Sequence, residues 1–281
     1  MERRIGVHVS IAGGLDKGLE RARELGCSTV QLFSHNPRGW AVGKRDAEEI
    51  MRFNKLKDDF DISPVVVHTS YLINLASVKK DLVQKSIAMI RAELDIADEI
   101  GAEFVVLHTG SASGDDPAAA RARAVEALKQ IAGRGSWKAG LLLENTAGER
   151  GDITSRIEEI AGIMEKVPSG LIAGLCLDTC HAYSAGYDIS DEKGIEDLSQ
   201  EIDQYISGEH LRLIHFNDSK KPMSSGVDRH EHIGEGTIGR AGLKKFLRHP
   251  LFFNIPLILE TPKKSDEDDE RNLRNVRELM A

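Results

Sequence analysis

The sequence predicts an eight-stranded, parallel β/α barrel formed by residues 1–281 as a single domain. Eight short runs rich in Val, Ile and Leu alternate with charged segments of helical period, at intervals of roughly 30–40 residues. Most of these runs are apolar at consecutive positions, as expected for parallel strands covered on both faces. No linker rich in Pro, Gly or Ser marks a second domain. These observations favour a TIM barrel of the α/β class over an open, doubly wound sheet, which is the alternative.

The strands are expected where the apolar runs lie, at residues 5–9, 29–33, 65–68, 104–108, 141–144, 174–178, 211–216 and 257–260. Amphipathic segments between them predict helices, most clearly at residues 16–25, 80–100, 117–132 and 153–166. The charged tail from residue 263 to 281 is expected to end in a surface helix packed on the barrel.

The formal net charge of −8 argues at first against a nucleic-acid partner, because such proteins usually carry a basic excess. Much of this acidity lies in local runs, such as residues 265–270, and the local field rather than the net charge governs phosphate binding. Net charge therefore excludes neither a nucleic-acid partner nor a small-molecule substrate.

The sequence predicts a cytoplasmic protein. No stretch approaches the ~20 apolar residues of a membrane helix, and the first residues run directly into a predicted strand, so no signal peptide is expected. An odd number of cysteines favours reduced, buried thiols over disulfides; they are Cys27, Cys176 and Cys180.

Residues that can bind metal ions stand at the ends of six successive predicted strands. In chain order they are His68, His108, Glu144, Asp178, His215 and Glu260. The following loops add three more, His181, Asp228 and His230. Because the carboxyl ends of barrel strands meet at one mouth, we expect these nine side chains to converge there. Four carboxylates in one place require cations to neutralise them. Imidazole and carboxylate donors suit zinc or manganese, and nine ligands with one bridging carboxylate suffice for three ions.

The chain resembles the endonuclease IV family of apurinic/apyrimidinic endonucleases over almost its whole length. The resemblance runs from Ile-Gly-Val-His-Val-Ser-Ile-Ala-Gly-Gly at residues 5–14 to Leu-Glu-Thr-Pro at residues 259–262. Its most specific segments are Leu-Asp-Thr-Cys-His-Ala-Tyr-Ser-Ala-Gly (177–186), His-Phe-Asn-Asp-Ser-Lys (215–220) and Asp-Arg-His-Glu-His-Ile-Gly-Glu-Gly (228–236).

The resemblance implies a barrel that holds three zinc ions and cuts duplex DNA on the 5′ side of abasic sites, in base excision repair. A first zinc would be held by His68, His108 and Glu144. Glu144 would bridge to a second zinc, held also by Asp178, His215 and Glu260. The third would be held by His181, Asp228 and His230. The carboxylates expected to take part in catalysis are Glu144, Asp178 and Glu260. Manganese also fits these donors at one or more sites.

Two residues match DNA-contacting positions of the family. Arg38, in Asn-Pro-Arg-Gly-Trp after the second strand, matches an arginine that enters the duplex. Tyr71, after the third strand, matches a minor-groove contact. Gly39 departs from the pattern, because some members carry a longer polar side chain there to fill the gap left by the extruded sugar. We expect a monomer, since the barrel mouth must stay open to a bent duplex.

Two other functions are compatible with a barrel of this kind. A metal-dependent sugar isomerase or epimerase would gather one or two ions, and His181 with the Asp228–His230 pair argues against it by adding a third site. A non-catalytic DNA-binding or metal-storage barrel would not need the complete set of nine ligands. We expect His8 to support a ligand rather than act as one, and we favour His230 over His232. The remaining histidines, His35, His210 and His249, are expected on the surface.

Overall fold

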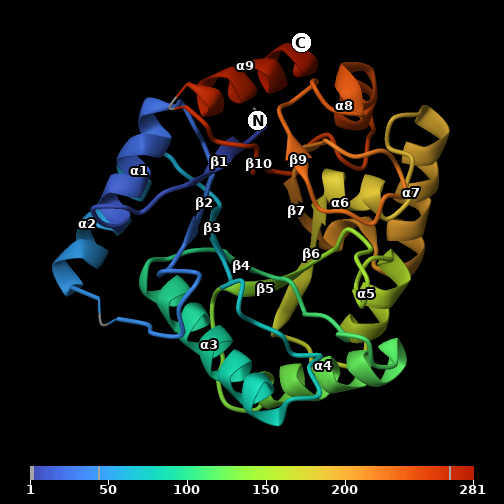
Figure 1. The fold of residues 1–281 in the computed structure, drawn as a ribbon. Helices are drawn as coiled ribbons and strands as arrows, with labels where there is room; N and C mark the ends of the chain where they lie inside the picture. Colours follow the sequence, from blue (N-terminus) through green and yellow to red (C-terminus); the bar gives the residue numbers. More distant parts are fainter. Residues whose placement is uncertain (1–2, 44, 266) are drawn as a thin grey trace.

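The eight parallel strands close into a barrel in the spatial order β1-β10-β7-β6-β5-β4-β3-β2, and the helices surround it (Figure 1). The structure is a computed structural model that describes residues 3–43, 45–265 and 267–281. Closure comes from β1, which pairs in parallel with β10 on one side and β2 on the other. The predicted TIM barrel is therefore confirmed, and the open sheet is excluded.

The barrel strands lie within about two residues of their predicted ends. They are β1 (Ile5–Val9), β2 (Val30–Phe33), β3 (Val65–His68), β4 (Phe104–Leu107), β5 (Gly140–Glu144), β6 (Ile172–Asp178), β7 (Leu211–His215) and β10 (Leu257–Leu259). A short antiparallel pair, β8 (Asp218–Ser219) and β9 (His230–Glu231), lies in the loop after β7. The sequence does not predict this pair, because two-residue strands leave no periodic pattern.

The helices are α1 (Leu15–Glu24), α2 (Ala47–Asp59), α3 (Lys80–Glu99), α4 (Pro117–Ala132), α5 (Ile157–Met164), α6 (Thr179–Ser184), α7 (Glu192–Tyr205), α8 (Gly239–Arg248) and α9 (Asp268–Met280), with a 3₁₀ turn η1 (Gly208–His210). Local chemistry fixes several of their ends. At α4, the Asp116 side chain accepts a hydrogen bond from Ala119 N and Pro117 takes the first helical position, as at many helix starts. Helix α9 confirms the surface helix expected in the tail.

Two apolar clusters hold the barrel together. A small cluster fills its interior and consists of Val66, Val106, Leu142, Cys176, Leu213 and Ile258. A much larger cluster lies between the strands and the surrounding helices. All three cysteines are buried and free, as predicted. In the described ranges, no helix is both long enough and apolar enough to cross a membrane.

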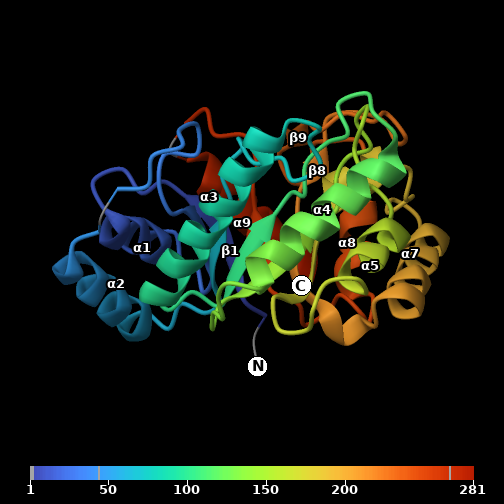
Figure 2. The ribbon, with the colours of Figure 1, turned by 90° about the horizontal axis from the view of Figure 1, so that it is seen from below.

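The loops that follow the strands, including β8 and β9, gather at one end of the barrel, and the described residues just before β1 lie at the other (Figure 2). This geometry carries every side chain at a strand end toward the same mouth.

Candidate metal centre

The nine side chains with metal-ligand chemistry meet at the barrel mouth. His68, Glu144, Asp178 and His215 are the last residues of β3, β5, β6 and β7, whereas His108 and Glu260 directly follow β4 and β10. His181 comes from α6, Asp228 from the loop after β7 and His230 from β9. Most of them line a cavity of about 880 Å³ that opens to the surface.

Glu144 is fully buried and lies at the centre of this cluster. His215 Nδ1 is 2.8 Å from its Oε1, and His108 Nε2 is 2.9 Å from its Oε2. His68 Nε2 lies 3.4 Å from Oε2. The two carboxylate oxygens therefore face different imidazoles, which is the arrangement that a carboxylate shared between two cations requires.

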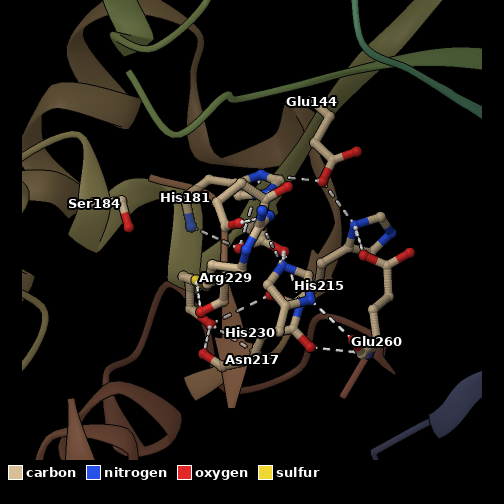
Figure 3. Close-up of polar contacts among 12 residues, drawn as sticks. Glu144, His181, Ser184, His215, Asn217, Arg229, His230 and Glu260 are labelled. Atoms are coloured by element: carbon tan, nitrogen blue, oxygen red, sulfur yellow. Dashed lines mark hydrogen bonds and ion pairs between the residues drawn. The ribbon is translucent and has the colours of Figure 1, made fainter. Parts of the chain in front are cut away.

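A second group of donor atoms adjoins Glu144. Ligand atoms of Glu144, Asp178, His215 and Glu260 all lie within 4.8 Å of one another. His215 Nδ1 is 3.2 Å from Glu260 Oε2 (Figure 3). Four donors at this separation can surround one cation.

A third group lies toward the surface. His181 Nε2 is 3.3 Å from Asp228 Oδ2, and His230 Nε2 is 3.4 Å from Asp228 Oδ1. Both Nε2 atoms are buried and have no hydrogen-bond partner among the described residues. Buried polar atoms without partners are costly unless another group binds them, so these nitrogens fit a cation.

The imidazole rings are oriented by their second nitrogen. The Nδ1 atoms of His68, His181 and His230 face backbone carbonyls, to which a protonated Nδ1 donates. The acceptors are the carbonyls of Thr69, Asn145 and Glu260, at 2.8, 2.9 and 2.9 Å. This leaves a lone pair on each Nε2, directed into the site, as is usual for metal-binding histidines. His215 is reversed, because its Nε2 faces Gln31 Oε1 at 2.8 Å and its Nδ1 faces the carboxylates.

The chain is similar to known proteins over almost its whole length. A family model described as a xylose isomerase-like TIM barrel matches residues 19–281. The chain is 42% identical to the probable endonuclease 4 of Halothermothrix orenii over 276 residues, which cover 97% of this chain and 98% of that protein. It is 39% identical to the probable endonuclease 4 of Aquifex aeolicus, with 98% and 96% of the two chains covered.

The chain belongs to the endonuclease IV family. Among solved structures, endonuclease IV of Thermus thermophilus matches with a TM-score of 0.86 and 35% identity, covering 99% of this chain and 98% of that one. A D-tagatose 3-epimerase-like protein matches with a TM-score of 0.74 and 21% identity over 99% and 97% of the two chains, and so shows only that the fold is shared. Membership of the family implies a metal-binding enzyme.

In this endonuclease IV family member, three polar residues that sequence reasoning missed hold the ligand residues in place, two through a carboxylate and one through the backbone of Asp178. Gln31 Nε2 donates to Glu260 Oε1 at 2.6 Å, and Asn217 Nδ2 donates to Asp178 Oδ2 at 2.7 Å. Asn145 Oδ1 accepts from Asp178 N at 2.7 Å. A signal was available, because Gln31 is a polar residue inside β2, Asn145 directly follows β5, and Asn217 lies two residues after the end of β7.

Asp178 also explains the spacing of the Asp-x-x-His segment. Its Oδ1 accepts a hydrogen bond from His181 N at 2.8 Å and so caps the start of α6. One carboxylate thereby fixes the helix that presents His181, while its second oxygen faces His230 Nε2 at 3.5 Å.

The charges of the centre compensate one another. Burial would raise the pKa of Glu144, but His108 and His215 outweigh it and hold that pKa well below the ordinary value. Burial would likewise raise the pKa of Asp228, yet the neighbouring His181 lowers it to about 2. Burial would lower the pKa of His181, and the carboxylates around it instead raise it well above the usual range. Cations that bind here replace imidazole protons, so metal binding releases protons.

The other histidines are separate from the nine. His8 Nδ1 lies 3.0 Å from Gln31 Nε2 and 3.5 Å from Glu260 Oε1, as expected for a residue that supports a ligand. His232 Nδ1 is 3.1 Å from Asn272 Nδ2 on α9, away from the cluster. The prediction that His35 lies on the surface is wrong, because its side chain is largely covered and faces Glu93.

Arg38 and Tyr71 occupy neighbouring loops at the rim. Tyr71 follows β3, lines the cavity and is 65% exposed, with its ring edge-on to Phe33 at 5.1 Å between centroids. Arg38 is exposed in the loop after β2 and is not among the cavity-lining residues. A Cβ at Gly39 would have no neighbour closer than 3.9 Å, so the rim has open space at this position.

Glu93 of α3 is a buried acid beneath this rim, and it gives the protein a testable pH dependence. Burial raises its pKa to about 8, so the folded protein holds this proton where the unfolded chain releases it. Stability is therefore lost as the pH rises from the ordinary glutamate range toward 8. Between pH 5 and 8 we expect the free energy of unfolding of the wild type to fall by up to ~3 kcal/mol relative to Glu93→Gln. Urea unfolding at both pH values measures this difference, and parallel pH profiles would contradict it.

Proposed function

We propose that this protein hydrolyses the phosphodiester bond on the 5′ side of abasic sites in duplex DNA. The products are a 3′-hydroxyl and a 5′-deoxyribose phosphate, as needed in base excision repair. We propose further that it acts as a monomer. The observation that carries the proposal is the convergence of nine imidazole and carboxylate donors at the mouth of one barrel. The relatives named probable endonuclease 4, at about 40% identity over nearly the full length, support a DNA-cleaving hydrolase.

The donor set fits three zinc ions, with manganese as an alternative at one or more positions. One ion would be held by His68, His108 and Glu144, a second by Glu144, Asp178, His215 and Glu260, and a third by His181, Asp228 and His230. The unpartnered Nε2 atoms of His181 and His230 support this division. Bound zinc would supply Lewis acidity, which stabilises negative charge on the phosphate and lowers the pKa of a water nucleophile.

The chain's own residues prepare this chemistry. Glu144 stays ionised at the base of the site, where the imidazoles of His108 and His215 face its two carboxylate oxygens. Gln31 and Asn217 fix the carboxylates of Glu260 and Asp178, so little reorganisation is needed when the phosphate binds. The cavity is wide enough for an extruded sugar-phosphate.

A duplex with one abasic site, labelled on either strand, tests the proposal. We expect a single cut on the 5′ side of the lesion, with a 3′ end that a DNA polymerase extends directly. No cut, or a cut on the 3′ side that leaves a blocked end, would refute it.

A sugar epimerase remains the alternative for this fold, since epimerase-like structures share it. The third donor group of His181, Asp228 and His230 favours phosphate chemistry instead, because a third bound cation adds positive charge at the mouth. Incubating the metal-loaded protein with D-fructose or D-tagatose separates the two functions. We expect no epimerisation, and turnover of either sugar without DNA incision would establish the alternative.

Arg38→Ala and Tyr71→Ala are expected to weaken substrate binding more than turnover. Both side chains stand on the rim, outside the metal centre. Stacking of a base on an aromatic side chain contributes ~1–3 kcal/mol, and an arginine can add a cation–π contribution. We expect KM for an abasic duplex to rise roughly 10-fold or more in each variant, with kcat and metal content little changed. Steady-state kinetics with metal analysis measure this, and a fall in kcat at constant KM would contradict the assignment.

A further inference from the structure

A buried carboxyl group lies beneath the two loops that carry Arg38 and Tyr71. Glu93, on α3, is fully buried. Its Oε1 accepts a hydrogen bond from Ser70 N at 2.9 Å. Its Oε2 has no hydrogen-bond partner within the described part of the chain. Glu93 is not one of the nine donors, so the metal centre does not account for a buried acid at this position.

Ser70 extends the contact to the neighbouring loop. Its Oγ donates to the carbonyl oxygen of Pro37 at 2.8 Å and accepts from Leu72 N at 3.2 Å. Pro37 directly precedes Arg38, and Tyr71 lies between the two bonded residues of the turn. A continuous path of hydrogen bonds therefore runs from α3 through the loop after β3 to the loop after β2.

His35 packs against the same carboxyl group. Its Nδ1 lies 3.0 Å from Ser34 Oγ and 3.8 Å from Glu93 Oε1, while its Nε2 is buried without a partner among the described residues. Burial raises the pKa of Glu93 to about 8 and lowers the pKa of His35. At neutral pH both groups are therefore uncharged, and Glu93 acts as a hydrogen-bonding group rather than as a charge.

We propose that Glu93 is a positioning residue for DNA binding, which through Ser70 holds Tyr71 and the Arg38 loop in a fixed relation at the rim. Loops anchored before binding lose less conformational freedom when the substrate arrives, so the anchor raises affinity without touching the substrate. The inference rests on the proposed action on abasic DNA, and concerns which residues set the affinity for it.

Four single variants test the proposal with the zinc-loaded, full-length protein. Glu93→Ala and Ser70→Ala break the path at different points. Glu93→Gln keeps an oxygen that can accept the hydrogen bond from Ser70 N. Glu99→Ala, on the same helix but exposed, is the matched control.

We expect KM for a duplex with one abasic site to rise roughly 10- to 100-fold in Glu93→Ala and Ser70→Ala, as for other displaced binding groups. We expect kcat and metal per chain to stay within about twofold of the wild type. Glu93→Gln and Glu99→Ala should match the wild type. Ser70→Ala keeps the buried acid and its bond from Ser70 N, and removes the bond from Ser70 Oγ to Pro37 O, so it tests the second half of the path even where Glu93→Ala folds poorly.

A double-mutant cycle identifies the route of the effect. If Ser70 acts through Tyr71, then Ser70→Ala combined with Tyr71→Ala raises KM by less than the product of the two single effects. The inference would be overturned if Ser70→Ala left KM unchanged, or if this variant lost kcat and bound metal together. In either case, incision of the abasic duplex by the wild type would still support the proposed function. Absence of incision by the wild type would instead refute the proposed function itself.

Discussion

Glu144→Ala is expected to abolish DNA incision while the barrel remains folded. The carboxylate is buried between His108 and His215, and donors of two of the proposed zinc sites face its two oxygens. Its removal takes a ligand from both sites at once. We expect activity to fall by more than ~1000-fold, beyond the cost of losing one charge-stabilising group.

Single-turnover incision of an abasic duplex measures this effect, with metal per chain and circular dichroism on the same sample. We expect fewer bound ions and an unchanged barrel spectrum. The control is Glu158→Ala, at an exposed position of α5, which should behave as the wild type. Full activity in Glu144→Ala would refute the metal-cluster account.

Glu260→Gln is expected to lower activity by roughly 100- to 1000-fold with little change in shape. The new side chain has the same size, and its carbonyl oxygen can still accept the hydrogen bond that Gln31 Nε2 donates at 2.6 Å. What it loses is the negative charge that faces His215 Nδ1 at 3.2 Å. A change of charge alone should therefore weaken the second proposed zinc site.

Metal analysis together with incision kinetics tests this second variant against Glu158→Gln. We expect Glu260→Gln to hold less metal at limiting zinc, and to regain part of its activity as zinc is added. If the variant kept wild-type kinetics and metal content, the carboxylate would have no role at the centre.

The sequence was sufficient to predict the fold because parallel barrel strands leave a strong local signal. Three successive apolar residues, Val65, Val66 and Val67, are all buried, as expected for a strand that is covered on both faces of the sheet. Strand ends were harder to place, and β6 begins at Ile172 rather than at residue 174. Gly174, with φ of 152° and no room for a Cβ against His210 O, lies where the register shifts between β5 and β6.

The positions of the nine donors could be predicted because barrel topology alone directs strand ends to one mouth. The contacts that orient them could not be predicted, although the orienting residues stand out as polar positions in or near apolar strands. Gln31 contacts Glu260 from a strand 229 positions earlier in the chain, and local sequence says nothing of such a contact. Glu93 gave no signal either, since a glutamate in an amphipathic helix is ordinarily solvent-exposed and only the packing of α3 reveals its burial.

The most direct test of the central claim measures incision and metal content on the same sample of this protein as zinc is restored to the stripped chain. We expect cleavage 5′ to a single abasic site to reach its full rate only as the chain approaches three bound zinc ions, and an intact duplex to stay uncut. Saturation at one ion per chain, with the abasic duplex left intact, would contradict this claim.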